Sequence, residues 1–340
     1  MTITDTTSAP LIAVVGATGT QGGSVIQALA DSDKQYRVRG FTRDATKATA
    51  EALKKQGVEM VSVNLVVENK DEIYRAFAGA DFAFLVTNFW EHTNMEREIS
   101  EGKLLIDAAK AAGVKGIIWS GLMPVTKISG GKYTHVYHFD GKAVVTEYGC
   151  NSGVPFVDVQ AGCYAENFVN AGNGIPLIKK QGDGSYVIAW AVTPDIVLPI
   201  IDMDDYGLYL RRVLEAPVFP NGSEVLTSGE DITAGELVRQ ISEITGKKVI
   251  YKQITVDEWN KSFTATGLPP PIVTELIEGF LYFEEFGCKF MAHFRGSNFT
   301  DLRAAVDYGG KPSSSREGLG RPTRSWKEVV RAADWSKTLV

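Results

Sequence analysis

The feature of this sequence that most constrains its fold is a glycine-rich segment near the amino terminus. Five apolar residues, Leu11 to Val15, run directly into the segment Gly16-Ala17-Thr18-Gly19-Thr20-Gln21-Gly22. An apolar strand, a glycine turn and a helix in this order direct backbone N–H groups and a positive helix end at one point. Gly16 allows a sharp turn, Gly19 allows phosphates to approach the backbone, and Gly22 allows the helix to pack close to the strand. The segment predicts a pyrophosphate site, and the alternative is a purely structural turn.

The first half of the chain alternates short apolar strands with helices. We expect strands at 11–15, 36–42, 58–63, 82–87, 116–120 and 156–160, and helices at 21–30, 45–55, 70–77, 95–112 and 139–150. The strands are rich in Val, Ile and Phe, which is typical of strands buried on both faces. Repeated strand–helix units with short connections imply right-handed crossovers. The sequence therefore predicts an α/β fold with a Rossmann-type, doubly wound parallel sheet.

This regular alternation ends near residue 169. The remainder mixes short strands with helices, with a loop at 170–176, a strand at 248–254, helices at 233–245, 256–263, 272–286 and 325–335, and a flexible polar segment at 311–320. We predict a flexible amino terminus (1–10), a dinucleotide-binding domain (11–168) and a smaller mixed α/β lobe (169–340). Such a lobe would cover the carboxyl-terminal edge of the sheet, where ligands bind in folds of this type.

Composition excludes several classes of protein. The formal net charge of −6 and the absence of a Lys/Arg block argue against a nucleic-acid-binding protein. No apolar run has membrane-spanning length, and the Thr-rich start is not a signal peptide. Three cysteines without C-x-x-C spacing favour a reducing compartment, so we predict a cytoplasmic protein that could also enter the nucleus. His135 and His138 lack further ligands nearby in the sequence, and we predict no metal site.

The residues after the second expected strand bear on the choice of nucleotide. That strand ends in Phe41-Thr42-Arg43-Asp44, and Lys47 follows one helical turn later. An acidic residue in this region would hold a ribose 2′-hydroxyl and favour NAD, whereas Arg43 could grip a 2′-phosphate with two hydrogen bonds. We predict NADP(H). In the alternative, Arg43 and Lys47 are solvated cations and Asp44 binds the hydroxyl.

Several stretches resemble the NmrA-like family, atypical members of the short-chain dehydrogenase superfamily. They are the glycine segment, Thr42-Arg43-Asp44, Ser120-Gly121-Leu122, His138-Phe139-Asp140-Gly141-Lys142, Gly153-Val154-Pro155-Phe156, and Cys163-Tyr164-Ala165-Glu166-Asn167-Phe168. The resemblance covers most of the chain and implies a Rossmann-type NADP(H)-binding domain with a small carboxyl-terminal lobe. It implies either a working reductase or a redox sensor that regulates a partner protein, because the family holds both.

The usual proton donor of the superfamily is missing from this sequence. Short-chain dehydrogenases place a tyrosine four residues before a lysine, on the same helix face, but His138 stands four residues before Lys142 here. His138 or Tyr133 could serve as a substitute acid, since a histidine titrates in a suitable range. The alternative is that His138 is a packed helix residue beside a ribose-binding lysine. Loss of the tyrosine is also compatible with reduction of an iminium or a conjugated enone, which needs less acid assistance.

The candidate residues divide into two sets. The candidate catalytic residues are Lys142, His138 and Tyr133, and the candidate cofactor-binding residues are Gly16, Thr18, Gly19, Thr20, Gln21, Gly22, Arg43, Lys47, Asn64, Thr87, Asn88, Ser120, Lys142, Tyr164 and Asn167. A stripe of Leu276, Phe280, Phe283 and Phe286 at near-helical spacing predicts core, with an apolar substrate pocket or a partner helix as alternatives. We predict an NADPH-dependent reductase of a small apolar ketone, enone or imine that could form a homodimer. The alternative is a non-catalytic NADPH/NADP sensor with a protein partner.

Overall fold

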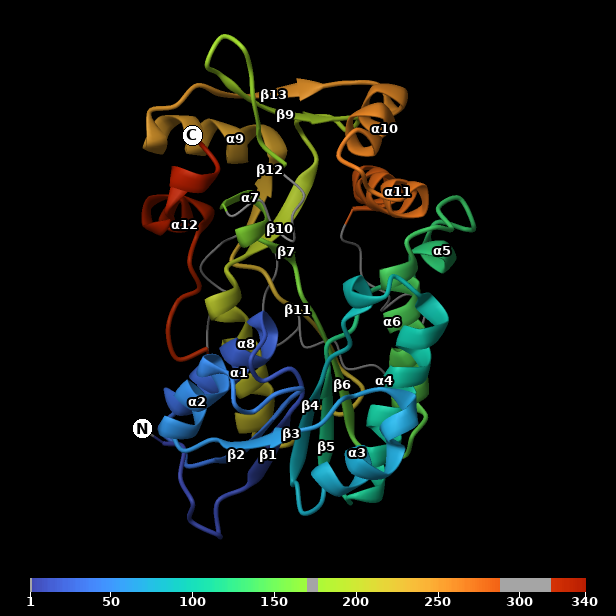
Figure 1. Cartoon of the computed structure of the whole chain (residues 1–340), viewed down its shortest axis with the longest axis vertical. Coiled ribbons are helices and arrows are strands. Elements are labelled where there is room, and N and C mark those ends of the chain that lie inside the picture. Colours follow the sequence, from blue (N-terminus) through green and yellow to red (C-terminus); the bar gives the residue numbers. More distant parts are fainter. Residues whose placement is uncertain (1, 170–176, 288–318) are drawn as a thin grey trace.

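The computed structural model describes residues 2–169, 177–287 and 319–340. The expected loop at 170–176, most of the polar segment at 311–320, and Cys288 lie outside the described residues. Within them, the chain forms a large parallel sheet with helices on both faces. A smaller lobe lies beyond one end of the strands of this sheet (Figure 1). The helices and strands of the larger part are β1 (Leu11–Val14), α1 (Thr20–Ala30), β2 (Arg37–Thr42), α2 (Ala48–Lys55), β3 (Glu59–Ser62), α3 (Lys70–Ala76), β4 (Phe82–Leu85), α4 (Met95–Ala111), β5 (Gly116–Trp119), α5 (Val125–Ile128), α6 (Tyr137–Cys150), β6 (Phe156–Gln160), α8 (Met203–Glu215) and β11 (Glu224–Leu226).

The large sheet has seven strands in the order β11-β6-β5-β4-β1-β2-β3. Every neighbouring pair in it is parallel. The chain first winds outward from β1 to β3 and then returns to β4 on the other side of β1, which places a topological switch point between β1 and β4. The predicted Rossmann-type, doubly wound fold is therefore confirmed.

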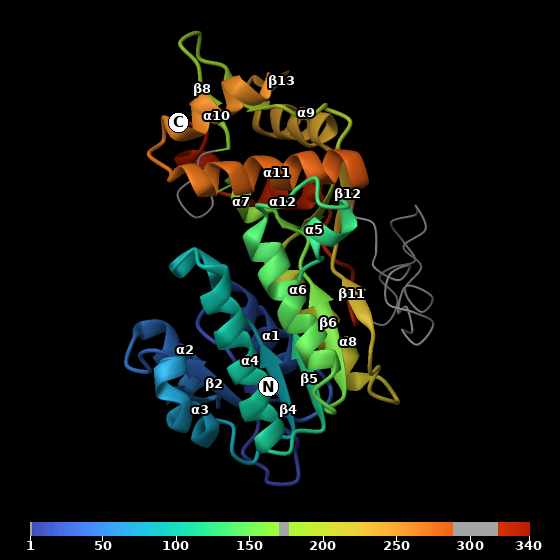
Figure 2. The ribbon, with the colours of Figure 1, turned by 90° about the vertical axis from the view of Figure 1, so that its right-hand side faces the viewer.

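Helices cover the two faces of this sheet. Figure 1 shows α3, α4 and α6 on one face and α1 and α8 on the other, and a turn of the view shows α4 and α6 running side by side (Figure 2). Helix α8 lies very close to α1: a Cβ added at Gly207 would be only 2.1 Å from the Ser24 carbonyl oxygen, and only glycine permits this approach. The Ser24 hydroxyl accepts the Gly207 N–H at 2.8 Å. Both faces are thus buried, as the continuous apolar strands require.

The smaller lobe packs two short sheets against helices around its own apolar core. Its elements are β7 (Cys163–Tyr164), α7 (Glu166–Val169), β8 (Lys179–Lys180), β9 (Tyr186–Trp190), β10 (Val197–Ile201), β12 (Glu230–Thr233), α9 (Ala234–Thr245), β13 (Val249–Gln253), α10 (Val256–Thr264), α11 (Pro270–Phe286) and α12 (Trp326–Ala332). The four residues of the predicted apolar stripe of α11 are partly buried and pack against the core, whereas its fully buried face is formed by other residues. Phe280 packs against Trp190 with ring centroids 4.6 Å apart and tilted planes, whereas Phe283 and Phe286 pack against Phe139 and Tyr133.

The structure divides the chain differently from the expected boundary at residue 168. After β10 the chain returns to the large sheet as α8 and β11, so residues 203–226 belong to the Rossmann part. The reason is that the apolar face of the amphipathic α8 packs against α1 and not against the smaller lobe. The start of the chain also differs from the expected flexible segment at 1–10. Ile3 is buried, and the backbone of Thr2 and Thr4 bonds to Tyr36.

None of the helices that the structure describes is long and apolar enough to cross a lipid bilayer.

Candidate functional site

The candidate site lies where the switch point of the large sheet faces the smaller lobe. It comprises the turn from β1 to α1, the segment after β4, the first turns of α6 and the β7–α7 segment, which side-chain contacts of Gln21 and Lys142 connect in pairs. Helix α11 reaches it from the smaller lobe, since its side chains contact α5 and α6. In doubly wound folds, a crevice at the switch point is the usual ligand position.

The glycine turn has the close backbone packing that its spacing predicts. Gly16 has a φ of +66°, a conformation that residues with a side chain rarely adopt. A Cβ at Gly22 would lie 2.2 Å from the Gly16 carbonyl oxygen, so only glycine lets α1 back against the turn. The turn is tied to the sheet because Ala17 N–H donates to the Phe41 carbonyl and Val15 N–H donates to the Phe84 carbonyl.

The amino-terminal end of α1 fits a pyrophosphate. Thr18, Gly19 and Thr20 are exposed, and the N-cap residue Gly19 places no side chain over the first turn. The first N–H groups of a helix have no acceptor within the helix, so those of Thr20, Gln21 and Gly22 are available to an anion. The Thr18 and Thr42 hydroxyls lie 3.3 Å apart.

Gln21 connects the glycine turn to the β7–α7 segment. Its Nε2 donates to the Tyr164 hydroxyl at 2.7 Å, which joins α1 to β7. Burial raises the pKa of the Tyr164 phenol to about 12, and the donation from Gln21 only partly offsets this. Tyr164 is therefore neutral at physiological pH and serves as a hydrogen-bonding group.

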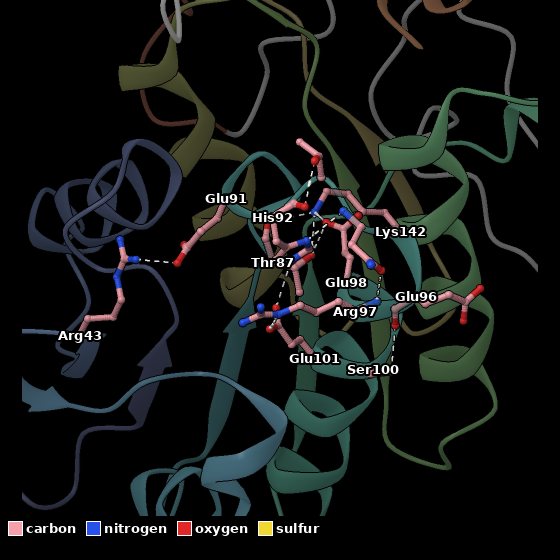
Figure 3. A network of polar contacts seen from close by, with 12 residues as sticks. Arg43, Thr87, Glu91, His92, Glu96, Arg97, Glu98, Ser100, Glu101 and Lys142 are labelled. Atoms are coloured by element: carbon pink, nitrogen blue, oxygen red, sulfur yellow. Dashed lines mark hydrogen bonds and ion pairs between the residues drawn. The ribbon is translucent and has the colours of Figure 1, made fainter. Parts of the chain in front are cut away.

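The predicted nucleotide-selecting cation is exposed at the end of β2. Arg43 Nη1 lies 2.7 Å from Glu91 Oε1, and the Arg43 side chain is 68% exposed (Figure 3). Asp44 is engaged locally, because its carboxylate accepts from the Thr46 N–H and hydroxyl, which lowers the pKa of that carboxyl. Lys47 is exposed at the start of α2. Arg43 and Lys47 are therefore two exposed cations close to the end of β2.

Lys142 occupies the centre of a buried polar cluster (Figure 3). Its Nζ lies 2.9 Å from Glu98 Oε1 and donates to the Thr87 hydroxyl at 2.8 Å and the Thr87 carbonyl at 3.1 Å. The Thr87 hydroxyl in turn donates to Glu98 Oε1 at 2.7 Å. Glu98 is fully buried, so the cluster holds the lysine ammonium at the end of β4 with its charge compensated.

His138 lies in the first turn of α6, one turn before Lys142. The predicted helix began at residue 139, but α6 begins at Tyr137 and includes the histidine. Its ring stands among aromatic side chains, with centroid distances of 5.0 Å to Trp90, 5.8 Å to Phe89 and 4.6 Å to Phe139. Because residues four apart share a helix face, His138 and Lys142 face the same side of α6.

The backbone N–H and the ring Nδ1 of His138 both contact one carboxylate, that of Glu275. Glu275 Oε1, on α11, lies 2.6 Å from His138 Nδ1 and accepts the His138 backbone N–H at 2.8 Å. His135 makes the equivalent pair of contacts with Glu278, one turn further along α11. In the described part of the chain, no cluster of three or more His, Cys, Asp or Glu side chains could hold a metal ion.

The second predicted proton donor, Tyr133, is placed in a different environment. Its hydroxyl donates to Glu285 at 2.9 Å, and its ring packs against Tyr282 and Phe286. Burial, and then the bond to Glu285, raise the pKa of this phenol. Tyr133 therefore links the loop before α6 to the end of α11, and its proton is engaged there.

The remaining predicted residues are spread around the site. Ser120 follows β5 and is buried, and its hydroxyl bonds to Tyr206. Asn88 is the exposed N-cap of the 3-10 turn Phe89–Glu91, and Asn167 lies half-buried in α7 beside Cys163. Asn64 is exposed after β3, where its carbonyl accepts from Asn69.

Sequence reasoning missed two buried carboxylates, Glu98 and Glu275. Each had a signal in the helical pattern. Glu98 shares the apolar face of Gly102, Leu105 and Ala109, and Glu275 shares that of Ile272, Gly279 and Tyr282. A carboxylate on an apolar helix face requires a buried partner, and here the partners are Lys142 and His138.

Comparisons with known proteins support this description of the fold. The model of the NmrA-like family matches residues 8–307. The NmrA-like oxidoreductase malD of Malbranchea aurantiaca is 31% identical over 261 residues, which cover 72% of this chain and 75% of malD. The crystal structure of NmrA, a negative transcriptional regulator, in complex with NADP is similar with a TM-score of 0.73, 24% identity and 95% coverage of both chains. The NADPH-dependent quinone oxidoreductase QOR2 of Escherichia coli, complexed with NADPH, has a TM-score of 0.71, 21% identity and coverage of 94% of this chain and 98% of QOR2.

Proposed function

We propose, from the premise that this chain belongs to the NmrA-like family, that it binds NADP(H) and reduces a small, largely apolar organic molecule. One observation carries the proposal. An ammonium and an imidazole, those of Lys142 and His138, lie on one face of α6 beside the switch point where the glycine turn would hold a dinucleotide. The relative malD is named an oxidoreductase, which is in keeping with the proposal.

The open end of α1 would hold the pyrophosphate, and Arg43 would select the 2′-phosphate. One charge-assisted hydrogen bond from a guanidinium contributes about 1.5–3 kcal/mol, which corresponds to a preference of about 10- to 100-fold for NADP(H). Arg43 is exposed and bound only to the exposed Glu91, so little energy is lost when it turns to a phosphate. NmrA and QOR2, which share this fold, were crystallised with NADP and NADPH respectively.

The chain's own groups would divide the chemistry between binding and proton transfer. A bound nicotinamide supplies the hydride. The three N–H groups of Lys142 contact Glu98 and Thr87, and the lysine would orient the cofactor and substrate by exchanging one of these contacts. His138 would donate a proton to the carbonyl oxygen of a ketone or enone. A positioned acid of this kind raises the reaction rate by about 10²–10⁴-fold. Reduction of an iminium would need no such proton, because hydride addition gives a neutral amine.

The surroundings of His138 favour a flat, apolar substrate. Phe89 and Phe139 are buried beside the imidazole, whereas Trp90 is 38% exposed and can offer a ring face to a ligand. A ring that is partly exposed at the mouth of a polar site is suited to stack on a conjugated carbon skeleton. We therefore propose conjugated ketones, enones, quinones or cyclic imines as the substrate class.

The test is NADPH consumption by the purified protein against these four substrate classes. Turnover of at least one, lost by more than about tenfold in His138→Ala for a carbonyl substrate, is the expected result. A protein that binds NADPH but consumes it with none of them would refute the reductase.

A second candidate is a non-catalytic sensor of the NADPH/NADP ratio that regulates a protein partner. The missing tyrosine four residues before Lys142 favours it, because the usual acid of the superfamily is absent. A sensor must bind the two redox forms with different affinity or change its association between them. Equal affinity for NADPH and NADP, with no change in oligomeric state, would exclude this role. For either function we propose a cytoplasmic protein and, as the simplest assembly, a homodimer.

A further inference from the structure

Glu275 is one of the buried carboxylates that the proposed chemistry has not yet used. It lies on α11 in the smaller lobe, is fully buried, and is separated from His138 by 137 residues of sequence. Its Oε1 contacts the His138 Nδ1 and backbone N–H, while Oε2 has no hydrogen-bond partner among the described residues. A carboxylate is costly to bury without a cation, so its position against a single imidazole calls for an explanation.

We propose that Glu275 is the positioning residue of His138, and that the two lobes complete the proton-transfer site together when α11 lies against α6. This inference rests on the proposed reductase function. A carboxylate cannot donate, so the contact at 2.6 Å requires the proton on Nδ1. Nε2 is then the nitrogen left to face a substrate, and it makes no hydrogen bond to the part of the chain that the structure describes.

The proton transfer follows from that arrangement. A bound dinucleotide would supply a hydride to a carbonyl substrate, and the substrate oxygen would then need a proton. The Nε2–H bond of the imidazolium breaks and an O–H bond forms on the product. The neutral imidazole keeps its Nδ1–H toward Glu275 and regains the Nε2 proton from water. Glu275 thus fixes the tautomer and the ring orientation without exchanging a proton itself.

A purely structural role for Glu275 predicts different results. The N-cap of α6, Val136, supplies no side-chain cap, so Glu275 also caps the helix through the His138 N–H. The other carboxyl that faces His138 belongs to Asp140, which is held by the Thr126 N–H and hydroxyl. Only the positioning role predicts that loss of Glu275 changes the tautomer of His138.

Two variants separate these roles. Glu275→Gln keeps an acceptor oxygen, and the His138 N–H holds that oxygen in place so that Nδ1 stays protonated. Glu275→Ala removes the acceptor. We expect kcat to fall by about 100-fold in Glu275→Ala and to be close to the wild-type value in Glu275→Gln. In the background of His138→Gln, adding Glu275→Ala should lower kcat no further. KM for NADPH should stay within about twofold of the wild type.

The matched control is Glu278→Ala. Glu278 lies on the same helix and also bonds a histidine through its backbone N–H and Nδ1, but His135 is exposed. We expect it to leave kcat within about twofold of the wild type.

A second readout does not depend on turnover. The chain has four histidines, so the ¹⁵N signals of the His138 ring can be assigned with His138→Gln. We expect a protonated Nδ1 in the wild type and in Glu275→Gln, and its loss in Glu275→Ala. If the wild type reduces no substrate, the proposed reductase function is refuted. The ring signals then test by themselves whether Glu275 holds the proton on His138 Nδ1. Ring signals and kcat that are unchanged in Glu275→Ala, with only a lower Tm, would overturn the inference.

Discussion

The two sides of the candidate site are built by different means. The nucleotide side consists of backbone: a left-handed glycine, a second glycine that admits no Cβ, and the open N–H groups of α1, all within seven residues. The side that would meet a substrate consists of buried side chains brought together from β4, α4, α6 and α11. Changes on the first side should affect ligand binding, whereas changes on the second should affect stability and chemistry.

The largest effect is expected on the side built from buried charges. Glu98→Ala leaves the ammonium of Lys142 buried without its carboxylate, which costs about 3–5 kcal/mol of unfolding free energy. The matched control is Glu51→Ala, whose partner Lys54 lies at the same kind of distance, 2.8 Å, on an exposed helix face. It should cost less than about 1 kcal/mol. Urea unfolding measures the loss of unfolding free energy in both variants. Equal losses would contradict the claim that the Glu98–Lys142 pair is buried.

The next effect tests the backbone side. Gly22→Ala places a Cβ 2.2 Å from the Gly16 carbonyl oxygen, so the turn must shift and NADPH affinity should fall by about 100-fold. Gly23→Ala is the control, because its Cβ would lie 3.8 Å from the nearest atom, an ordinary contact. Calorimetric titration, with circular dichroism to confirm folding, checks both. Wild-type affinity in Gly22→Ala would show that the turn does not hold the nucleotide.

A smaller effect is expected at the position that selects the nucleotide. Arg43→Ala should weaken NADPH binding by about 10- to 100-fold, because one charge-assisted contact to the 2′-phosphate is lost, and should leave NADH binding unchanged. Lys47→Ala, in an exposed cation nearby, serves as the comparison and should have the smaller effect. If both variants weaken the two nucleotides equally, Arg43 contributes only general charge.

The smallest effect concerns the exposed partner of Arg43. Glu91→Gln removes a pair worth less than about 1 kcal/mol, so NADPH affinity should rise by no more than about fivefold. Glu96→Gln removes an exposed carboxylate that points away from Arg43 (Figure 3) and should change nothing. A drop in affinity in Glu91→Gln would mean that the pair holds Arg43 in its binding position.

The difference between the two sides also explains what the sequence could predict. The glycine turn and the alternating strands and helices are local patterns, and the structure has them with small shifts at the element ends. The return of α8 and β11 to the large sheet was missed, because it depends on how α8 packs against α1. Glu98 and Glu275 were missed for the same reason: their partners are distant in sequence, and only packing brings them together.

The placement of Tyr133 gives the clearest example on the catalytic side. Sequence proximity to His138 made it a candidate acid, but its hydroxyl is bound to Glu285 on α11. A contact between lobes sets the surroundings of this residue, and no local pattern around it contains that information.

The measurement that tests the central claim most directly is a calorimetric titration of the wild-type protein with NADPH and, separately, with NADH. The account predicts one site per chain that binds NADPH at least about tenfold more tightly than NADH. Absence of binding heat for both nucleotides, or tighter binding of NADH, would contradict it.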